Sequence, residues 1–570
     1  MRDFSTNLFM RKLLCMIMKT MRENPYNKIT SLGCIAILFG IIFNLMGCER
    51  KTLVEIGTEQ QVIHIGNGTD IQGVDPVVTT GMPEYHVIMA LFEGLVSKDP
   101  KTLETVPGVA DSWTVSDDGM KYEFHIRDNA KWSDGNPLTA QDFVDAWHRA
   151  LMPALGNEYI DSLFVFKNAE KFYLGEITDI SQVGFKALDQ QHLSVELESP
   201  TPYFLQLLDH HSLFPTPVSV IKKFGAVDDP TNPWTKAANF VGNGPFVIDE
   251  WTPGKVFRVK RNPYYWDTKN VKLNAINFYP IEQLLSEERM FRAGYLHKTE
   301  WMPYAKIEKY KKSKDPNYRT HAYLATYFYL INVTRPPLND VRVRKALAYS
   351  IDREAITENV TRGNQVPTGS LTPPDTLGYS PRSKMVFNPE LAKKLLAEAG
   401  YPDGKNFPEI ELIYNTQEDH QKIAQAVQAM WKKYLGIKIN IKNQEWKVYL
   451  NTQKMLDFGL SRMAWVGDYV DPNTFLELFI TGGGNNRTGW SNHEYDVLIE
   501  KAANAHSRIE RYEYFMQAED ILVDQVPFIP IYHYSTNNLV STDVKGFYDN
   551  LMDYHPYKYI YLESDKKKNE

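Results

Sequence analysis

One stretch of the sequence combines an apolar run with charged residues: Leu460-Ser461-Arg462-Met463-Ala464-Trp465-Val466-Gly467-Asp468-Tyr469-Val470-Asp471-Pro472-Asn473-Thr474. It begins as an apolar, strand-like run and ends in acidic residues. Asp471 and Pro472 are typical of a helix start, with Asp at the N-cap and Pro at the first helical position. Capping therefore does not explain Asp468, which lies between aromatic residues at the end of the predicted strand. A carboxylate buried there needs a cationic partner, because an unpaired buried charge is costly.

The sequence leaves two kinds of partner open for Asp468. One is a Lys or Arg of the same chain, and the other is the ammonium group of a ligand. Arg462, six residues upstream, offers the opposite charge on the strand face that also carries Ala464 and Val466. An anion site and a cation site held apart on one extended segment suit a zwitterion such as a short peptide.

Length and composition indicate a large globular protein. The 570 residues are too many for one ordinary core, so we expect two or three domains. Aromatic residues make up 13% of the chain, an excess that suits either a packed core or a lined binding cavity.

The N-terminus is typical of a bacterial export signal. Lys28 precedes an apolar run from Leu32 to Met46, which is short for a membrane span and suits the hydrophobic region of a signal peptide. The run ends Leu45-Met46-Gly47-Cys48, which resembles a lipoprotein signal with lipid attached at Cys48. We expect a signal peptide over residues 1–47, or over 21–47 if translation starts at Met21. An ordinary signal peptide or an anchor helix is the alternative.

Cysteine use and charge narrow the class further. The three cysteines are Cys15, Cys34 and Cys48, so after processing only Cys48 remains and no disulfide or cysteine metal site is expected. The processed chain holds 57 Lys and Arg against 68 Asp and Glu, a net charge of −11. This acidic balance argues against a nucleic-acid partner.

No catalytic motif stands out. The sequence contains no G-x-S-x-G, H-E-x-x-H or P-loop spacing. His210 and His211 adjoin in an apolar context that favours a structural role. The acidic pairs Asp117-Asp118 and Glu287-Glu288 lie in surface-like surroundings. These absences weaken the enzyme hypothesis, and neither a cofactor nor a metal is expected.

The periodicity predicts alternating helices and strands, hence an α/β architecture. Helix caps are expected at Thr139 with Asp142, at Asp340, at Asp352 and at Asn388, and Gly400 is expected to end a helix. Residues 54–75 read as strand, turn, strand, and 84–93 as a helix. Further strands are predicted at 122–127, 193–197, 410–414, 437–441 and 528–534, and further helices at 419–435 and 511–523. Residues 323–332 are very aromatic.

Several longer motifs carry a family resemblance. The chain resembles the exported solute-binding proteins of the peptide family that serve ABC importers, and most of all the oligopeptide-binding type, over about residues 53–562. The resemblance rests on the opening stretch and on four further motifs, Leu91-Phe-Glu-Gly-Leu95, Ala130-Lys-Trp-Ser-Asp-Gly135 with Thr139-Ala-Gln-Asp-Phe-Val144, Asn339-Asp-Val-Arg-Val-Arg-Lys-Ala-Leu347 and Asn443-Gln-Glu-Trp446.

The resemblance implies an α/β fold of the two-lobed periplasmic binding protein type, with an extra third domain and the ligand enclosed between the lobes. By position, the first lobe comprises residues 48–92, 218–324 and 536–570. The extra domain comprises 93–217, and the second lobe 325–535.

The resemblance also implies residue roles. Asp468 matches an aspartate that pairs with the ligand α-amino group, and Arg462 an arginine that meets the carboxylate of tripeptide-length ligands. Ala464 and Val466 match strand positions whose backbone pairs with the peptide, as does the neighbourhood of Met82. The remaining matches are pocket walls: Trp446, Trp465, Tyr159, Tyr323 and Tyr534.

Three positions depart from the family pattern. Thr361 stands where the family has a lysine for very short ligands. The segment 371–387 is short and lacks the histidine that meets the carboxylates of longer ligands. His533 replaces the usual aromatic residue beside Tyr534. Recognition of the ligand C-terminus, and so the preferred length, stays open.

The expected function is capture of short peptides by main-chain pairing and delivery to an ABC permease, without catalysis. We expect a lipid-anchored monomer outside the cytoplasm, either periplasmic or on the cell surface. Alternatives in the same class are receptors for dipeptides, murein peptides or a peptide signal. Rivals from other classes are an adhesin or sensor lipoprotein and a peptidase.

Overall fold

A computed structural model describes residues 51–505 and 507–564. The predicted signal peptide and Cys48 lie outside the described residues. All elements below belong to one compact unit, Leu53–Glu570. Among its described helices, none combines the length and the apolar character that crossing a membrane would require.

Three main sheets organise this unit. The first has the strand order β1-β10-β9-β8, in which β1 is parallel to β10 and the other pairs are antiparallel. Its strands are β1 (Val62–Gly66), β10 (Ala275–Tyr279), β9 (Val256–Arg261) and β8 (Phe246–Thr252). The second is antiparallel, in the order β4-β5-β7-β6. Its strands are β4 (Ala110–Val115), β5 (Lys121–Ile126), β7 (His192–Glu196) and β6 (Phe185–Ala187).

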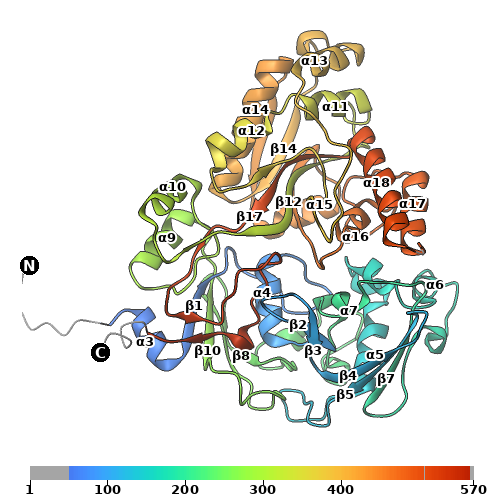
Figure 1. Cartoon of the computed structure of the whole chain (residues 1–570), viewed down its shortest axis with the longest axis vertical. Coiled ribbons are helices and arrows are strands. Elements are labelled where there is room, and N and C mark those ends of the chain that lie inside the picture. The colour runs from blue at the N-terminus through green and yellow to red at the C-terminus, as the bar shows by residue number, and fades with distance from the viewer. Residues whose placement is uncertain (1–50, 506, 565–570) are drawn as a thin grey trace, which may run out of the picture. The chain divides into compact units, whose positions relative to one another are not determined.

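The third sheet has six strands in the order β13-β17-β12-β16-β14-β15. Strand β14 runs parallel to β15 and β16, and the remaining pairs are antiparallel. Figure 1 shows this sheet and its helices at one end of the unit and the two four-stranded sheets at the other. The strands are β13 (Val366–Pro367), β17 (Phe528–Ser535), β12 (Ala322–Ile331), β16 (Leu460–Val466), β14 (Ile410–Asn415) and β15 (Ile439–Gln444).

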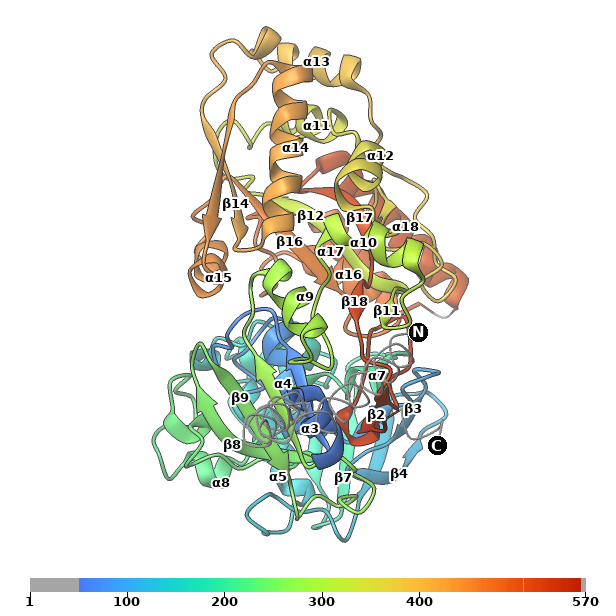
Figure 2. The same cartoon turned by 90° about the vertical axis from the view of Figure 1, so that its left-hand side faces the viewer.

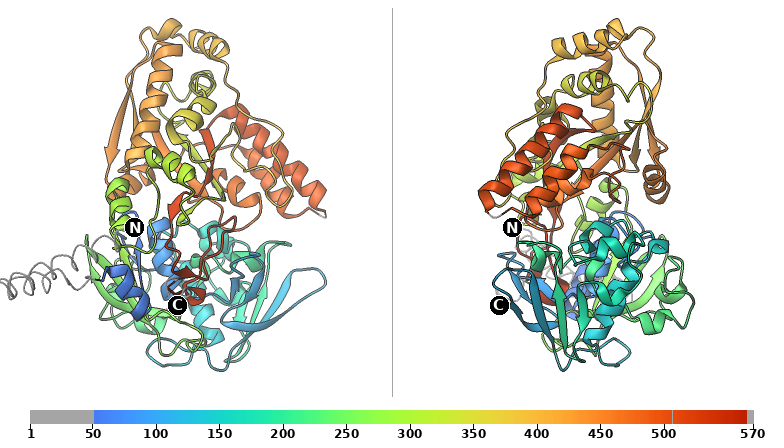
Figure 3. Two further views of the ribbon diagram at one scale, coloured as in Figure 1. Left: turned by 60° about the vertical axis from the view of Figure 1, so that its left-hand side comes forward. Right: turned by 90° about the vertical axis from the view of Figure 1, so that its right-hand side faces the viewer.

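Helices flank the sheets, and α17 and α18 pack side by side in both views of Figure 3. The longer ones are α3 (Leu53–Gln60), α4 (Met82–Leu91), α5 (Ala140–Ala150), α9 (Leu284–Arg292), α10 (Tyr304–Ser313), α11 (Val341–Tyr349), α13 (Pro389–Glu398), α14 (Glu418–Leu435), α15 (Trp446–Lys454), α17 (His493–Ala503) and α18 (Arg508–Gln525). The shorter ones are α6 (Ala169–Tyr173), α7 (Phe204–Leu207), α8 (Val218–Ile221), α12 (Arg353–Ile356) and α16 (Asn473–Leu476).

Each sheet has its own hydrophobic core. Core residues of the six-stranded sheet fall within 324–532. Those of the β1 sheet come from 63–92, 214–278 and 540–562. The β4–β7 sheet draws its core from 77–213 and from Tyr469. The α/β fold class is confirmed, whereas the domain boundaries stay a prediction.

The chain passes between the two ends of the unit at a small two-stranded sheet. There β11 (Tyr318–Arg319) pairs with β18 (Asn538–Leu539) in antiparallel register. Figure 2 shows both strands between the two ends. Strand β12 begins at Ala322, directly after this crossing, so the crossing segments also carry residues of the six-stranded sheet.

The helix caps predicted at Thr139, Asp340, Asp352 and Asn388 are confirmed. At α5 the Thr139 N–H donates to the Asp142 carboxylate at 2.8 Å, which forms a capping box. The side chains of Asp340, Asp352 and Asn388 accept backbone N–H groups at the starts of α11, α12 and α13. These contacts are local, within four residues, which is why sequence alone predicts them.

Two element predictions were wrong. The segment from Val54 is the helix α3 rather than a strand, and its buried face holds Gly57 and Thr58. A Cβ on Gly57 would lie 2.4 Å from the Val62 carbonyl oxygen, so glycine permits the close approach of α3 to β1. Helix α4 starts at Met82, two residues before the predicted start, with Pro83 in its first turn.

The expected exposure of Glu287-Glu288 was also wrong. Both side chains are buried in α9, at 0% and 1% exposure. Glu287 accepts the Glu300 N–H at 2.7 Å, and Tyr310 donates to Glu288 at 2.8 Å. Burial raises the pKa of Glu287 to about 8, so this carboxyl is held in its neutral form near pH 7.

The predicted N-cap at Asp471 was wrong by one residue, and Asp471 has another role. It accepts the Asn473 N–H at 2.9 Å, but α16 begins at Asn473 and Pro472 is the cap position. The Asp471 carboxylate is also buried and forms a two-pronged ion pair with Arg511, at 2.6 and 2.8 Å. A long-range ion pair, which the local pattern does not reveal, therefore anchors the end of the segment 460–474.

Candidate functional site

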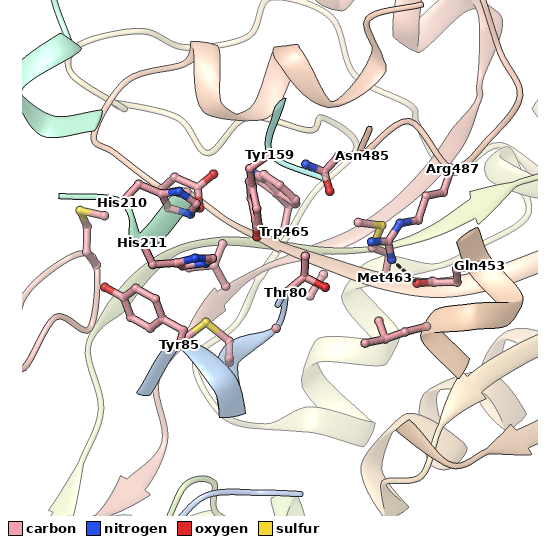
Figure 4. Close-up of a pocket in the computed structure, with 18 of the residues that line it drawn as sticks. Thr80, Tyr85, Tyr159, His210, His211, Gln453, Met463, Trp465, Asn485 and Arg487 are labelled. Carbon is pink, nitrogen blue, oxygen red and sulfur yellow. Dashed lines mark hydrogen bonds and ion pairs between the residues drawn. The ribbon is translucent and has the colours of Figure 1, made fainter. Parts of the chain in front are cut away.

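Two adjoining pockets lie along β16. They share seven lining residues, among them Met82, Trp446 and Arg462. Figure 4 shows side chains of the first pocket converging from α4, from the 159 and 210 regions and from the six-stranded sheet. Every residue predicted to bind peptide lines one or both pockets: Met82, Tyr159, Tyr323, Trp446, Arg462, Ala464, Trp465, Val466, Asp468 and Tyr534.

Strand β16 leaves part of one edge unpaired. On one side it pairs with β12 along its whole length, from Leu460 to Val466. On the other side its pairing with β14 covers only Leu460 and Ser461. The Arg462 carbonyl is taken up by Tyr449 and Gln453, which donate to it. Beyond Arg462, no strand among the described residues pairs with the second edge, and this part of β16 lines the pockets.

The backbone direction on this edge follows from one hydrogen bond. Gly467 N–H donates to the Leu324 carbonyl of the β12 side at 2.8 Å. In an antiparallel pair, hydrogen-bonded and non-hydrogen-bonded residues alternate. Val466 and Ala464, one and three residues before Gly467, therefore direct their N–H and C=O groups away from β12. The edge offers a short extended ligand the pairing groups of a neighbouring strand.

Asp468 lies at the end of this edge without a cationic partner among the described residues. The titratable group in contact with its carboxylate is His210, whose Nε2 lies 3.5 Å from Asp468 Oδ1. The Asp468 side chain is 16% exposed. Burial lowers the pKa of His210 well below its usual value, so this imidazole is neutral. Lys98, the other nearby cation, is engaged with Asp209 at 3.0 Å.

The surroundings disfavour the ionised form of Asp468. Burial raises the pKa of its carboxyl to about 7, and only the more distant charge of Lys98 opposes this. The internal salt bridge that would explain the residue structurally is not made by the described residues. A ligand cation would supply the missing charge.

Arg462 lies at the other end of the unpaired edge and also lacks a carboxylate partner among the described residues. Its Nη2 donates to the Tyr534 hydroxyl at 2.7 Å and its Nη1 to Asn415 at 3.4 Å. The guanidinium sits over the Tyr327 ring, 4.8 Å from its centroid. These contacts orient the group but leave its charge uncompensated.

Aromatic side chains enclose the edge between these charges. The Tyr159 and Trp465 rings lie 6.4 Å apart, as do those of Tyr323 and Tyr534. The Tyr323 hydroxyl lies 3.9 Å from Met82 Sδ. Met82 is the first residue of α4 and so offers a helix start rather than a strand edge. The roles of these residues stay predictions.

Several lining residues were missed by sequence reasoning. His210 and His211 line the first pocket. His210 contacts Asp468, while His211 bonds to the Pro76 carbonyl at 2.7 Å. Arg487 also lines it and is paired with Glu158 and with Gln453. The sequence signal that could have identified the two histidines as pocket residues is the polar run 209–211 inside an apolar segment. Nothing local marked Arg487.

The positions that depart from the family pattern do not supply a carboxylate partner. Thr361 is fully buried and bonds to the Thr357 carbonyl, outside both pockets. His533 is buried and bonds to Thr326 at 2.9 Å. Neither of these two residues lines either pocket.

Comparisons with known proteins agree on one family. The model of the family described as bacterial extracellular solute-binding proteins, family 5, middle part, matches residues 104–487. The periplasmic oligopeptide-binding protein OppA of Salmonella typhimurium is 35% identical over 531 residues, which cover 90% of this chain and 95% of the relative.

Solved structures give the same result. The murein tripeptide binding protein MppA of Escherichia coli matches with a TM-score of 0.84 and 35% identity, over 88% of this chain and 98% of that one. Haemophilus influenzae OppA in complex with the peptide RPPGFSPFR matches with a TM-score of 0.84 and 34% identity, over 89% of this chain and 99% of that one. The unliganded open form of MppA matches with a TM-score of only 0.61 and 34% identity, over 89% of this chain and 98% of that one. The arrangement described here is therefore closer to the peptide complex than to the open form.

Proposed function

The chain belongs to family 5 of the bacterial extracellular solute-binding proteins, and we propose that it captures short peptides outside the cytoplasm and delivers them to an ABC permease. The observation that carries this proposal is the unpaired edge of β16, with the uncompensated charges of Asp468 and Arg462 at its two ends. A peptide is the ligand that brings backbone pairing groups and both opposite charges together.

In this proposal the peptide adds to β16 as a further strand. Backbone pairing is indifferent to side chains, so affinity need not depend on sequence. Asp468 holds the α-amino group, and Arg462 holds the carboxylate of a tripeptide-length ligand. The aromatic walls and Met82 contact the ligand side chains. Enclosure strengthens both ion pairs because it removes them from water.

The proposal includes binding without chemistry. The family and the named relatives consist of binding proteins, and neither pocket needs a bond-breaking step to account for its charges. We further propose a lipid anchor on Cys48, action as a monomer, and the domain boundaries given by position. The two lobes would then be 48–92, 218–324 and 536–570 for one and 325–535 for the other, with 93–217 as the extra domain.

The test combines a substitution with a change in the ligand. Asp468→Asn keeps the shape of the side chain but cannot neutralise a ligand ammonium. Removing one member of a buried charge pair costs roughly 2–5 kcal/mol, so peptides with free N-termini should bind about 30- to 4000-fold more weakly. N-acetylated peptides should bind the wild type poorly and lose little more in the variant. Calorimetry on the four combinations measures the coupling.

Asp457→Asn is the matched control, because Asp457 is exposed and lies outside both pockets. It should leave all affinities unchanged. Additive losses, with no coupling between substitution and acetylation, would show that Asp468 is not the α-amino partner. Cleavage of the peptide would favour a peptidase, and failure to bind any small peptide would favour an adhesin. Native mass spectrometry of the purified protein would weigh any ligand carried through purification.

A further inference from the structure

His321, Asp553 and His555 form a compact cluster outside both peptide pockets. His321 Nε2 lies 3.3 Å from Asp553 Oδ1, and His555 Nε2 lies 2.7 Å from the same oxygen. One atom from each residue can be chosen so that all three atoms lie within 4.8 Å of one another, the only such group among the described residues. His321 is far from the other two in sequence, so no motif announced the cluster.

The hydrogen bonds of His321 fix which ring nitrogen carries a proton. Nδ1 lies 3.0 Å from the Ala322 carbonyl oxygen, which can only accept, so Nδ1 must be the donor. In the neutral ring Nε2 then presents a lone pair to the Asp553 carboxylate. Two lone pairs do not attract each other, so this gap requires a positive centre, either a proton or a metal ion.

The same bond is the arrangement expected behind a metal ligand. A histidine that binds metal through one nitrogen usually donates its other N–H to a carbonyl or carboxylate, which fixes the ring. His555 is held as well, because its ring stacks on Phe547 with centroids 3.5 Å apart. Its Nδ1 has no hydrogen-bond partner among the described residues, so Nε2 is its only engaged nitrogen.

The spacing and exposure suit a metal of the zinc class. Ligands about 2.0–2.2 Å from a tetrahedral zinc lie roughly 3.3 Å from one another. The His321 to Asp553 distance has this value, and the His555 contact would lengthen by about half an ångström. The side chains are 13%, 15% and 9% exposed, so the cluster reaches solvent while its ligands are held in place. The nearby cation Lys298 is paired with Glu300 at 3.2 Å.

We propose that His321, Asp553 and His555 bind one divalent transition-metal ion such as Zn²⁺, with water completing the coordination. Two imidazoles and a carboxylate are a donor set that this class of metal prefers. The ion would brace the crossing between the two ends of the unit, because His321 exchanges hydrogen bonds with Thr536 on the neighbouring crossing segment. It would also steady two pocket residues, since Tyr323 and Met552 lie one or two positions away in the chain.

The test uses the full processed chain, stripped with a chelator and titrated with Zn²⁺ by calorimetry. One ion per chain should bind, and the melting temperature should rise. Asp553→Asn should weaken binding by at least about a hundredfold, since even outer-shell changes cost 10- to 100-fold. Asp553 has φ 49°, and Asn tolerates this left-handed conformation, so the backbone is kept. His555→Phe, which keeps the stack on Phe547, should weaken binding similarly.

His493→Ala is the control, because His493 is an exposed histidine outside the cluster; it should leave the affinity for Zn²⁺ unchanged. Co²⁺ substitution gives an independent readout, because a four-coordinate nitrogen and oxygen site produces visible absorption that the two cluster variants should lose. Circular dichroism checks that the variants fold. Absence of stoichiometric binding, or binding that survives both cluster variants, would overturn the proposal. A proton on His321 Nε2 would then bridge the gap to Asp553. Burial opposes protonation of His321, but the hydrogen bond to Asp553 outweighs burial and raises the pKa of His321 overall.

Discussion

At the scale of the residue, Asp468 is a charge that the empty protein holds at a cost. Burial raises its folded-state pKa to about 7, whereas an unfolded aspartate titrates near 3.9. Between these values the folded state binds more protons than the unfolded state. The contribution to the free energy of unfolding is therefore undiminished below about pH 4 and falls as the pH rises toward 7.

This gives a prediction for the ligand-free protein. Relative to the wild type, Asp468→Asn should gain stability as the pH rises from 5 to 8, by about 2–3 kcal/mol from the two pKa values. Thermal melting at both pH values, after removal of any bound ligand, measures the change. If the variant melts below the wild type at pH 8, Asp468 takes part in an internal salt bridge and the ligand role fails.

At the scale of the element, β16 sets the distance between the two charges. Arg462 and Asp468 are six residues apart on one extended segment. The C-terminal carboxylate of a short peptide would therefore meet Arg462, whereas a longer peptide would extend past it. Arg462→Ala should therefore weaken the binding of tripeptides more than that of pentapeptides, by about tenfold or more. The reason is that a charge-assisted hydrogen bond is worth roughly 1.5–3 kcal/mol.

Calorimetry with tripeptides and pentapeptides of matched composition measures this difference. Lys447→Ala provides the control, because Lys447 is an exposed cation on α15 outside both pockets. It should change neither affinity. Equal losses at all ligand lengths after Arg462→Ala would remove the assignment.

The sequence predicted those features whose interacting residues lie close together in the chain. The caps at Thr139, Asp340 and Asn388 bond to groups within four residues, so the sequence displays both partners. The unpaired edge of β16 depends instead on where β14 stops, and the deep burial of Glu287 depends on Glu300 and Gly66. A Cβ on Gly66 would lie 1.7 Å from the Glu287 carboxylate, a contact that no window of sequence contains.

At the scale of the whole molecule, the family resemblance predicted the fold class and ten peptide-binding residues, all of which line the two adjoining pockets. Physical reasoning from the residues alone reached only Asp468, Arg462 and the strand between them. The polar neighbours of Asp468, such as His210 and Lys98, come from other parts of the chain and were missed. Their positions depend on how the second sheet packs near the end of β16, where Tyr469 stacks on Tyr203 with centroids 4.4 Å apart.

The Leu45-Met46-Gly47-Cys48 pattern carries a prediction about the processed molecule. Cys48→Ser should abolish lipid attachment and leave an unprocessed precursor, because the proposed lipid would be attached to the cysteine sulfur. Mass spectrometry of the membrane fraction and a mobility shift on gels measure both effects. A Cys48→Ser protein that is still cleaved and still anchored by lipid would contradict the assignment.

The unpaired edge of β16 has a consequence for how the protein behaves in a crowd of its own copies. A strand with free N–H and C=O groups is a template on which other chains assemble, and exposed edges lead to aggregation. Here the free edge lies inside a pocket walled by Trp446, Tyr159 and α4, which a folded neighbour cannot enter. Only a thin, single extended chain reaches it. The pocket walls therefore shield this edge from pairing with the strands of other copies of the chain.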